Sequence, residues 1–469
     1  MLSFLTLDAQ QLHHLVIFDP VSLLSKQSIL KYSWKTNRYN LYKFAHITDC
    51  HLGSWRNPKL RALNLQAFEK SILISIKEQV DFILITGDFF DVNIPQLAPV
   101  KRAVEILKCA KDSDIPIYMI YGSHDFNTAN ISMIDILHSA ELFIKPTEFQ
   151  FNNDSVILKF FIDKKTGAKI TGISGRKIGL DKEFYEKLDK KRLESEDGFK
   201  IFLLHRGIQE ILPIDFQFKD SIPISLVPKG FDYYGGGHIH KRIEKKNDHG
   251  LIVYPGPLFG STFQDLEETA RGEKRGFYII SFDNQILDCK FIEINVAEIL
   301  YKEISSEKWN SEKLEDEITK NISELQVKNK IVLIKVKGKL VGKRSNIDFG
   351  KFNLDISKRG AVLSFINTYN LSSDETRAVV VRSDNKVDIE SEIFRESIKN
   401  FQLESALSNK VKNQINSKLI GKAGEKISIS LLDVLRNEKL ENENTSTYDD
   451  RIFSYAKSIF DEEGYFYDN

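Results

Sequence analysis

The stretch Phe82-Ile83-Leu84-Ile85-Thr86-Gly87-Asp88 is the part of this sequence that most constrains the fold. Its apolar run predicts a buried β-strand, and the glycine after it predicts a turn. A carboxylate directly beyond a buried strand has no packing role, so Asp88 is a candidate metal ligand. Its two oxygens could bridge two cations about 3.5–4 Å apart, the separation used in two-metal phosphoryl displacement.

Other short segments also place Asp or His after an apolar run: Asp49-Cys50-His51, Gly122-Ser123-His124-Asp125, Leu204-His205-Arg206 and Gly237-His238-Ile239-His240. In extended backbone, residues two positions apart face the same way, so the outer members of the first and last segments could each grip one ion. Polar side chains that end different strands can converge at one edge of an open sheet. Any one of these histidines could be structural, but the ordered series favours metal binding.

The ligand set predicts which metals would bind. Mixed Asp and His ligands without a thiolate suit Mn, Fe or Zn and disfavour Mg or Ca, and manganese is the first choice. Such ions would lower the pKa of a water molecule and neutralise charge on a phosphate. His124, after the predicted strand 117–121, could then protonate the departing oxygen, or it could simply hydrogen-bond to Asp125. Cys50 is expected to be buried with its thiol turned away from the ions.

Composition limits the classes of protein that this chain can be. Its 469 residues suggest about three domains, and a formal net charge of zero provides no global attraction for nucleic acid or anionic membrane. The three cysteines are too few for a disulfide framework, which favours a reducing, intracellular location. No apolar run is long enough to cross a bilayer, so no membrane association is expected. Residues 1–40 lack the features of a secretory signal and are interpreted as an extension of unknown role.

The pattern of apolar residues predicts the domain order. Residues 41–295 alternate strands and helices, which predicts an α/β domain whose sheet is covered on both faces. Residues 296–388 read as a smaller α+β domain. Residues 389–469 show helical spacing, with a polar linker at 441–446 before an amphipathic helix that carries Ile452, Phe453, Ile459 and Phe460. That last helix could dock on a partner or pack on its own chain.

The smaller domain contains a basic stretch made of Lys335, Lys337, Lys339, Lys343 and Arg344. These side chains could follow a phosphate backbone, which would make the domain a DNA-binding cap. The alternative is that they form an ordinary solvated face.

The ordered series of Asp- and His-bearing motifs resembles that of the calcineurin-like metallophosphoesterases. Residues 203–208 (LLHRGI), 233–240 (YYGGGHIH) and 253–256 (VYPG) resemble more narrowly the Mre-type and SbcD-like DNA double-strand-break repair nucleases. The resemblance covers about residues 44–260. It implies a four-layer α/β/β/α catalytic domain, a capping domain that holds DNA, helices that bind a Rad- or SbcC-type ABC ATPase with a coiled coil, and a homodimer formed through helices of the catalytic domain.

The resemblance also implies roles for individual residues. Asp49, His51, Asp88 and His240 would hold one manganese ion, Asp88, His205 and His238 would hold the other, and His124 matches the catalytic histidine. Ser123 stands where the family usually has an Asn ligand of the second ion, and Asp91 stands where many Mre-type enzymes have His.

The implied activity is manganese-dependent exonuclease or endonuclease action on DNA ends. Two alternatives stay open: a phosphodiesterase or phosphatase acting on small phosphate esters, and a non-catalytic DNA-repair scaffold.

Overall fold

The computed structural model describes residues 41–126, 131–176, 181–213, 221–373, 422–437 and 445–462. The chain separates into two units between Ala297 and Glu298, and each unit is considered by itself. The predicted extension 1–40, the predicted boundary after residue 388 and the helical spacing predicted just beyond it lie outside the described residues.

The first unit contains a mixed five-stranded sheet in the order β15, β14, β1, β2, β3. Its strands are β1 (Tyr42–Ile47), β2 (Phe82–Thr86), β3 (Ile117–Ile120), β14 (Gly276–Phe282) and β15 (Ile286–Glu293). β1, β2 and β3 are parallel, whereas β14 is antiparallel to both β1 and β15. The carboxyl ends of β1, β2 and β3 therefore meet at one edge, where the segments 49–51, 87–91 and 122–125 begin.

A second sheet has six strands in the order β12, β13, β11, β8, β7, β6. They are β6 (Phe161–Ile162), β7 (Lys169–Ile173), β8 (Lys200–Leu204), β11 (Tyr233–Gly236), β12 (Ile243–Lys246) and β13 (Leu251–Tyr254). The four central strands are parallel. The alternation of strands and helices, taken alone, predicted one sheet covered on both faces, and this expectation is corrected by the second sheet. A buried apolar strand has the same composition whether a sheet or a helix covers it.

The shorter strands and the helices of the first unit complete its outer layers. The strands are β4 (Phe149–Asn152) and β5 (Ser155–Leu158), which form a hairpin, and β9 (Gly207–Ile208) and β10 (Ser221–Ile222). The helices are α1 (Pro58–Lys77), α2 (Leu97–Asp112), α3 (Met133–Ser139), α4 (Lys182–Glu186), α5 (Lys190–Glu194) and α6 (Phe263–Ala270). α1 begins where the Asn57 side chain accepts a hydrogen bond from the Lys59 N–H, with Pro58 at its first position.

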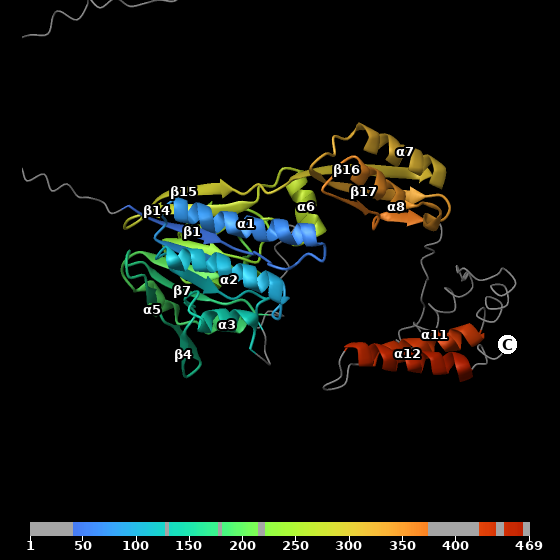
Figure 1. Cartoon of the computed structure of the whole chain (residues 1–469). Helices are drawn as coiled ribbons and strands as arrows, with labels where there is room; N and C mark the ends of the chain where they lie inside the picture. Colours follow the sequence, from blue (N-terminus) through green and yellow to red (C-terminus); the bar gives the residue numbers. More distant parts are fainter. Residues whose placement is uncertain are drawn as a thin grey trace, which may run out of the picture. The chain divides into compact units, whose positions relative to one another are not determined.

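Apolar side chains join the layers of this unit. Between the two sheets, Phe44 and Phe82 of the first pack with Ile201 and Tyr233 of the second. Helices α1 and α2 lie side by side against the first sheet (Figure 1). On the far face of the second sheet, side chains from α4 and α5 join the core beside Phe202. This α/β/β/α order confirms the fold class that the resemblance implied.

The second unit contains a parallel sheet with two helices. Its elements are β16 (Glu298–Trp309), α7 (Ser311–Glu324), β17 (Lys330–Leu340), α8 (Phe349–Lys358), β18 (Leu363–Asn367) and β19 (Leu371–Ser373). Leu314 and Ile318 of α7 and Phe352 of α8 form a core with Val332 and Ile334 of β17. β17 continues through the Gly- and Lys-bearing stretch as far as Leu340, and Gly338 pairs with Ser306 of β16.

Two further helices, α11 (Lys422–Leu435) and α12 (Thr445–Glu462), pack against each other. The Tyr448 hydroxyl of α12 donates to the Asn437 carbonyl just beyond α11 at 3.0 Å. α12 begins inside the predicted linker 441–446, since Ser and Thr are common at the start of a helix. Among the described helices, none is long and apolar enough to cross a membrane.

Candidate metal centre

The loops after β1 and β2 run side by side and carry three candidate ligands. The His51 N–H donates to the Asp88 carbonyl at 2.9 Å, and the Asp49 N–H donates to the Gly87 carbonyl at 3.2 Å. Asp49, His51 and Asp88 have φ angles of 48°, 43° and 47°, in the left-handed region that non-glycine residues rarely adopt. Such backbone is typical of functional sites. The expected reason for the pairing of Asp49 with His51, alternation along a strand, is therefore wrong: left-handed turns bring them together.

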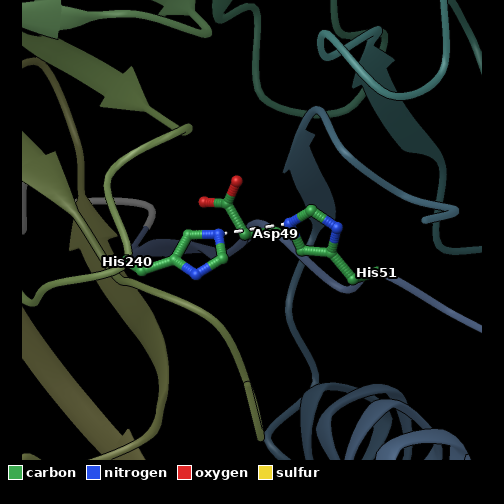
Figure 2. A group of neighbouring side chains, drawn as sticks. All are labelled: Asp49, His51 and His240. Atoms are coloured by element: carbon green, nitrogen blue, oxygen red, sulfur yellow. Dashed lines mark hydrogen bonds between the residues drawn. The ribbon is translucent and has the colours of Figure 1, made fainter. Parts of the chain in front are cut away.

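Asp49, His51 and His240 form the first group, with one ligand atom of each within 4.8 Å of the others. The Nε2 atoms of His51 and His240 lie 3.1 Å apart. Figure 2 shows the two rings with these nitrogen atoms directed toward each other beside the Asp49 carboxylate. Nδ1 of His240 lies 3.0 Å from Asp265 Oδ1. Because a carboxylate only accepts, Nδ1 carries the hydrogen and the neutral ring presents a lone pair on Nε2.

Asp88, His205 and His238 form the second group, again with one ligand atom of each within 4.8 Å of the others. His205 and His238 follow strands of the second sheet, so this group joins the two sheets. Nδ1 of His205 donates to the Thr86 carbonyl at 2.7 Å, which leaves the lone pair of Nε2 directed toward Asp88 Oδ2 at 3.2 Å.

Asp88 faces both groups. Its Oδ2 atom lies 3.2 Å from Nε2 of His205 and 3.7 Å from Nε2 of His51, and its side chain is almost completely buried. Its Oδ1 atom accepts from the backbone N–H of His124 at 2.8 Å. One oxygen of this carboxylate, Oδ2, therefore faces a histidine of each group.

The donor set fits two cations. A lone pair of His205 points at one of Asp88, and a lone pair of His51 points at one of His240. At such short distances, two lone pairs repel each other unless a proton or a cation lies between them. Nε2 of His205 is buried and has no hydrogen-bond partner among the described residues. A neutral imidazole with a bare nitrogen beside a carboxylate is an ordinary divalent-metal ligand.

The pKa values of the histidines reflect the same electrostatic environment, because a proton can bind where a metal ion would bind. Burial alone would lower the pKa of His51, but its contact with Asp91 and the charges of Asp88 and Asp49 raise it to about 9. For His205, the charge of the contacting Asp88 carboxylate likewise outweighs burial and raises the pKa to about 10. Burial lowers the pKa of His238 to about 4, so that ring stays neutral. The site attracts positive charge strongly.

The loop after β3 carries His124 and Ser123 to the edge of the site. His124 is exposed, and one of its ring nitrogens lies within 4.8 Å of ligand atoms of His51 and Asp88. Its Nδ1 contacts the Asp91 carbonyl at 2.6 Å rather than the Asp125 side chain, so the alternative hydrogen bond to Asp125 is not formed. Ser123 is half-buried in the same loop. Asp91 places Oδ1 3.2 Å from Nδ1 of His51.

Asp125 and Asp265 support the site, and sequence reasoning assigned neither of them this role. Asp125 is buried and accepts from the backbone N–H groups of Gly122, Phe89 and Phe90 at 2.9–3.1 Å, which ties the β2 and β3 loops together. Burial and the nearby charge of Asp88 raise the pKa of Asp125 to about 6. Asp265 lies in a capping box that begins α6, so its sequence signal is that of a helix start.

Glycines allow the closest approaches in the site. A Cβ at Gly122 would lie 2.1 Å from Asp88 Oδ1, so no larger residue fits without moving the loop or the carboxylate. Gly235 and Gly236 belong to β11, which leads to His238. At Gly236 a Cβ would lie 2.3 Å from the Tyr254 ring, so a glycine is required at this position to leave room for that ring.

Cys50 and the basic stretch were also predicted from the sequence. Cys50 is buried, as expected, and burial raises the pKa of its thiol. In the second unit, Lys335, Lys337 and Lys339 alternate along β17 with core residues, so they share the sheet face opposite α7 and α8. Lys337 pairs with Glu303 at 2.6 Å.

Two basic residues follow that strand. Lys343 is exposed, and the Arg344 guanidinium donates to the Thr368 hydroxyl. The five basic residues therefore divide between one sheet face and the segment just beyond the strand.

Comparison with known proteins identifies similar chains. Residues 42–242 match the calcineurin-like phosphoesterase family. The chain is 28% identical over 272 residues to the DNA double-strand break repair protein Mre11 of Methanocaldococcus jannaschii, covering 53% of this chain and 65% of that one. The Mre11 proteins of Sulfolobus acidocaldarius and Saccharolobus solfataricus are 29% and 32% identical, covering 61% and 55% of this chain and 71% and 64% of theirs. The matches thus span about two thirds of each relative.

Proposed function

Because residues 42–242 belong to the calcineurin-like phosphoesterase family, whose fold implies a dinuclear metal centre, we propose that this chain is a manganese-dependent nuclease that processes the ends of broken double-stranded DNA. The similarity to Mre11 proteins over more than half of the chain supports the choice of substrate. An intracellular location would follow from that role.

The observation that carries the proposal is the position of the Asp88 carboxylate between two ligand groups. Asp49, His51 and His240 would hold one ion together with Asp88, and His205 and His238 would hold the second together with Asp88. Ser123 would offer a hydroxyl to the second ion. When bound, the two ions would lower the pKa of the attacking water and neutralise charge on the phosphate.

His124 would supply the proton for the departing oxygen. Its Nδ1 is held by the Asp91 carbonyl at 2.6 Å, so Nε2 is the atom that remains to exchange a proton. The exposure of the ring places it where substrate can reach it. A protonated His124 would donate from Nε2 as the phosphodiester bond breaks, which contributes about 10²–10⁴-fold in comparable enzymes.

Manganese is the proposed metal because the centre combines carboxylate and imidazole ligands and has no thiolate among its groups. Metal content of the purified chain, measured before and after dialysis against each divalent ion, tests this choice. Retention of zinc in place of manganese would overturn it.

The decisive experiment compares His124→Ala with His138→Ala, since His138 is an exposed histidine on α3 outside the ligand groups. With manganese and a linear duplex, His124→Ala is expected to lose at least about a hundredfold in cleavage rate while it retains both ions. His138→Ala should cleave normally. A His124→Ala protein that cleaves DNA at the normal rate would refute the assignment of the acid.

We also propose that α11 and α12 bind the ATPase partner implied by the resemblance. They form a pair of packed helices that leaves Leu435, Phe453 and Tyr455 substantially exposed. Phe453 is 72% exposed, which is unusual for a large apolar side chain on a helix with a packed neighbour. Loss of ATPase binding in Phe453→Ser, with nuclease activity on free ends retained, would support this role.

A homodimer is proposed through α3 and the segment before α2. Ile94, Leu97, Ile131 and Ile136 are each more than half exposed, and the Met133 N–H donates to the Asn93 carbonyl, which joins the two segments. A second copy covering these side chains would remove them from water. Leu97→Asp together with Ile136→Asp should convert a dimer to a monomer in light-scattering measurements.

The lysine face of β17 is proposed to bind the phosphate backbone of DNA. If Lys335, Lys337 and Lys339 each neutralise a phosphate, replacing them with Gln should make the salt dependence of duplex binding shallower by roughly 0.9 for each phosphate that is no longer neutralised. An unchanged slope would leave this face without a role in DNA binding.

Hydrolysis of small phosphate esters is the second candidate function, because the same metal centre would serve it. The ratio of activity on linear DNA to activity on methyl p-nitrophenyl phosphate separates the two candidates. A ratio that favours the small ester would overturn the nuclease proposal.

A further inference from the structure

A pocket lies between the loop after β3 and the loop after β7. Tyr121 and Phe126 line it from the first loop, and Ser174 and Arg176 line it from the second. The two loops are joined at this point, because the Gly175 N–H donates to the Tyr121 carbonyl at 2.8 Å.

These loops also form part of the metal centre. His124 lies on the first loop, between the two aromatic residues that line the pocket. A Cβ at Gly175 on the second loop would lie 2.8 Å from Cδ2 of His205. The loop that carries Ser174 and Arg176 therefore also packs against His205 of the second ligand group.

Two cations border the pocket, with the charge of Asp135 acting on Lys145 and that of Glu183 acting on Arg176. Lys145 and Arg176 are both half-buried, and neither forms an ion pair with any residue that the structure describes. Burial lowers the pKa of Lys145. The charge of Asp135 raises this pKa in part, and the charge of Arg176 lowers it. Like charges beside one half-buried space favour an anion there.

Aromatic rings hold these cations in place. The Lys145 Nζ atom lies 3.7 Å from the Tyr121 ring centroid, and the Arg176 guanidinium lies 4.3 Å from the ring of Phe184 and 5.3 Å from that of Phe126. Contacts of this kind orient a cation without neutralising it. Both groups thus keep their hydrogen-bond donors for a ligand.

Further aromatic side chains come from the β4–β5 hairpin. Phe149 lines the pocket and packs edge-on against Phe184 with ring centroids 5.0 Å apart. Phe151, on the same strand, is 64% exposed. Exposed aromatic rings beside a basic groove are what proteins use to stack the bases of single-stranded nucleic acid.

The pocket has the size of a subsite. Its volume of about 80 Å³ would hold roughly three water molecules, which is space for a group such as a phosphate but not for a base as well. A phosphate group beside a planar base combines the negative charge and the aromatic face that this lining complements.

We propose that this pocket binds the phosphate of one unpaired nucleotide of the substrate strand against Lys145 and Arg176, while the base lies outside the cavity against Phe184 and Phe149. The proposal rests on the proposed nuclease function and narrows its substrate to a DNA strand that is single or frayed at the cleavage point. Duplex ends would have to open by at least one base pair to fill the pocket.

The first test separates the phosphate contact from the base contact. In Lys145→Met, which keeps the length of the side chain, KM for a single-stranded oligonucleotide should rise roughly tenfold at unchanged kcat, and its dependence on log salt should become shallower by about 0.7. In Phe184→Leu, KM should also rise roughly tenfold with no change in the salt slope. Lys77→Met, at an exposed lysine that ends α1, is the matched control and should behave like the unaltered chain.

A second readout reports stacking directly. An oligonucleotide with 2-aminopurine at the terminal position should lose fluorescence when the full chain binds it, and Phe184→Leu should abolish that loss. Inorganic phosphate alone should compete with the oligonucleotide only weakly. Competition by phosphate as strong as that by 5′-dAMP would overturn the nucleotide assignment, because it would show that the base contributes nothing.

Hydrolysis of methyl p-nitrophenyl phosphate distinguishes failure of this inference from failure of the proposed function. The small ester carries no nucleoside, so every variant should hydrolyse it normally. If the unaltered chain hydrolyses neither substrate, the proposed function fails. If it hydrolyses both, and the Lys145 and Phe184 variants match the Lys77 control on DNA, the pocket has no part in substrate binding and the inference is wrong.

Discussion

Asp265→Asn should weaken one metal site and leave the other intact. Asp265 Oδ2 accepts from the backbone N–H groups of Ser261 and Thr262 at 2.8 and 3.0 Å, while Oδ1 lies 3.0 Å from Nδ1 of His240. An amide has only one oxygen, and that oxygen would stay hydrogen-bonded to the backbone N–H groups of Ser261 and Thr262. The NH₂ group would then face Nδ1 of His240, where two donors cannot pair.

The magnitude follows from the tautomer of His240. With a donor opposite Nδ1, the neutral ring would move its hydrogen to Nε2, the atom that lies 3.1 Å from Nε2 of His51 and would bind the cation. Loss of such an outer partner typically lowers metal affinity about 10–100-fold, or roughly 1.4–2.7 kcal/mol. The site of Asp88, His205 and His238 is oriented by the Thr86 carbonyl instead, so its affinity should not change.

Calorimetric titration with manganese measures both sites on one sample. The unaltered chain should bind two ions, and Asp265→Asn should show one event weakened about 10–100-fold and one unchanged. Asp288→Asn, at an exposed position of β15, is the matched control. Equal weakening of both events in a variant that melts at the normal temperature, or no weakening at all, would refute the reasoning.

Three other changes have defined outcomes. Gly122→Ala places a Cβ 2.1 Å from Asp88 Oδ1, so we expect a destabilisation of about 1–3 kcal/mol in urea unfolding together with loss of hydrolysis, and normal activity would contradict the fit described for the loop. Ser123→Asn should tighten the second metal site in the same titration, because an amide carbonyl is a better ligand than a hydroxyl. Burial lowers the pKa of His46 from 6.5 to about 3. Between these two pH values, His46 is therefore protonated in the unfolded chain and neutral in the folded chain. Stability is therefore complete above pH 6.5 and falls as the pH drops toward 3, by about 2 kcal/mol at pH 5. In His46→Gln that loss between about pH 7 and 5 should be absent, and an equal loss would exclude His46 as its source.

Local pattern was sufficient for the elements that carry the site. β2 has the bounds that its apolar run predicted, Phe82–Thr86, because a run of β-branched and aromatic residues before a turn signal leaves few alternatives. The ligand types were also accessible, since Asp and His after such runs have no packing reason to be there. The resemblance added the order of layers, which periodicity could not provide.

Contacts between distant residues could not be predicted in the same way. Asp265 was not assigned to the site because its capping box has the signature of any helix start, and its contact with His240 depends on how α6 packs. The left-handed conformation of Asp49 and His51 was not expected either, because it is imposed by pairing with the β2 loop rather than by their own side chains.

By itself, the sequence determined which chemical groups follow which strands, because burial of a strand and exposure of the residue after it depend on neighbours in the chain. Only the tertiary structure decided that His205, on the second sheet, directs Nε2 toward Asp88 on the first. That contact requires two sheets to stack through Phe44, Phe82 and Tyr233, and such stacking depends on the combined shape of side chains far apart in sequence.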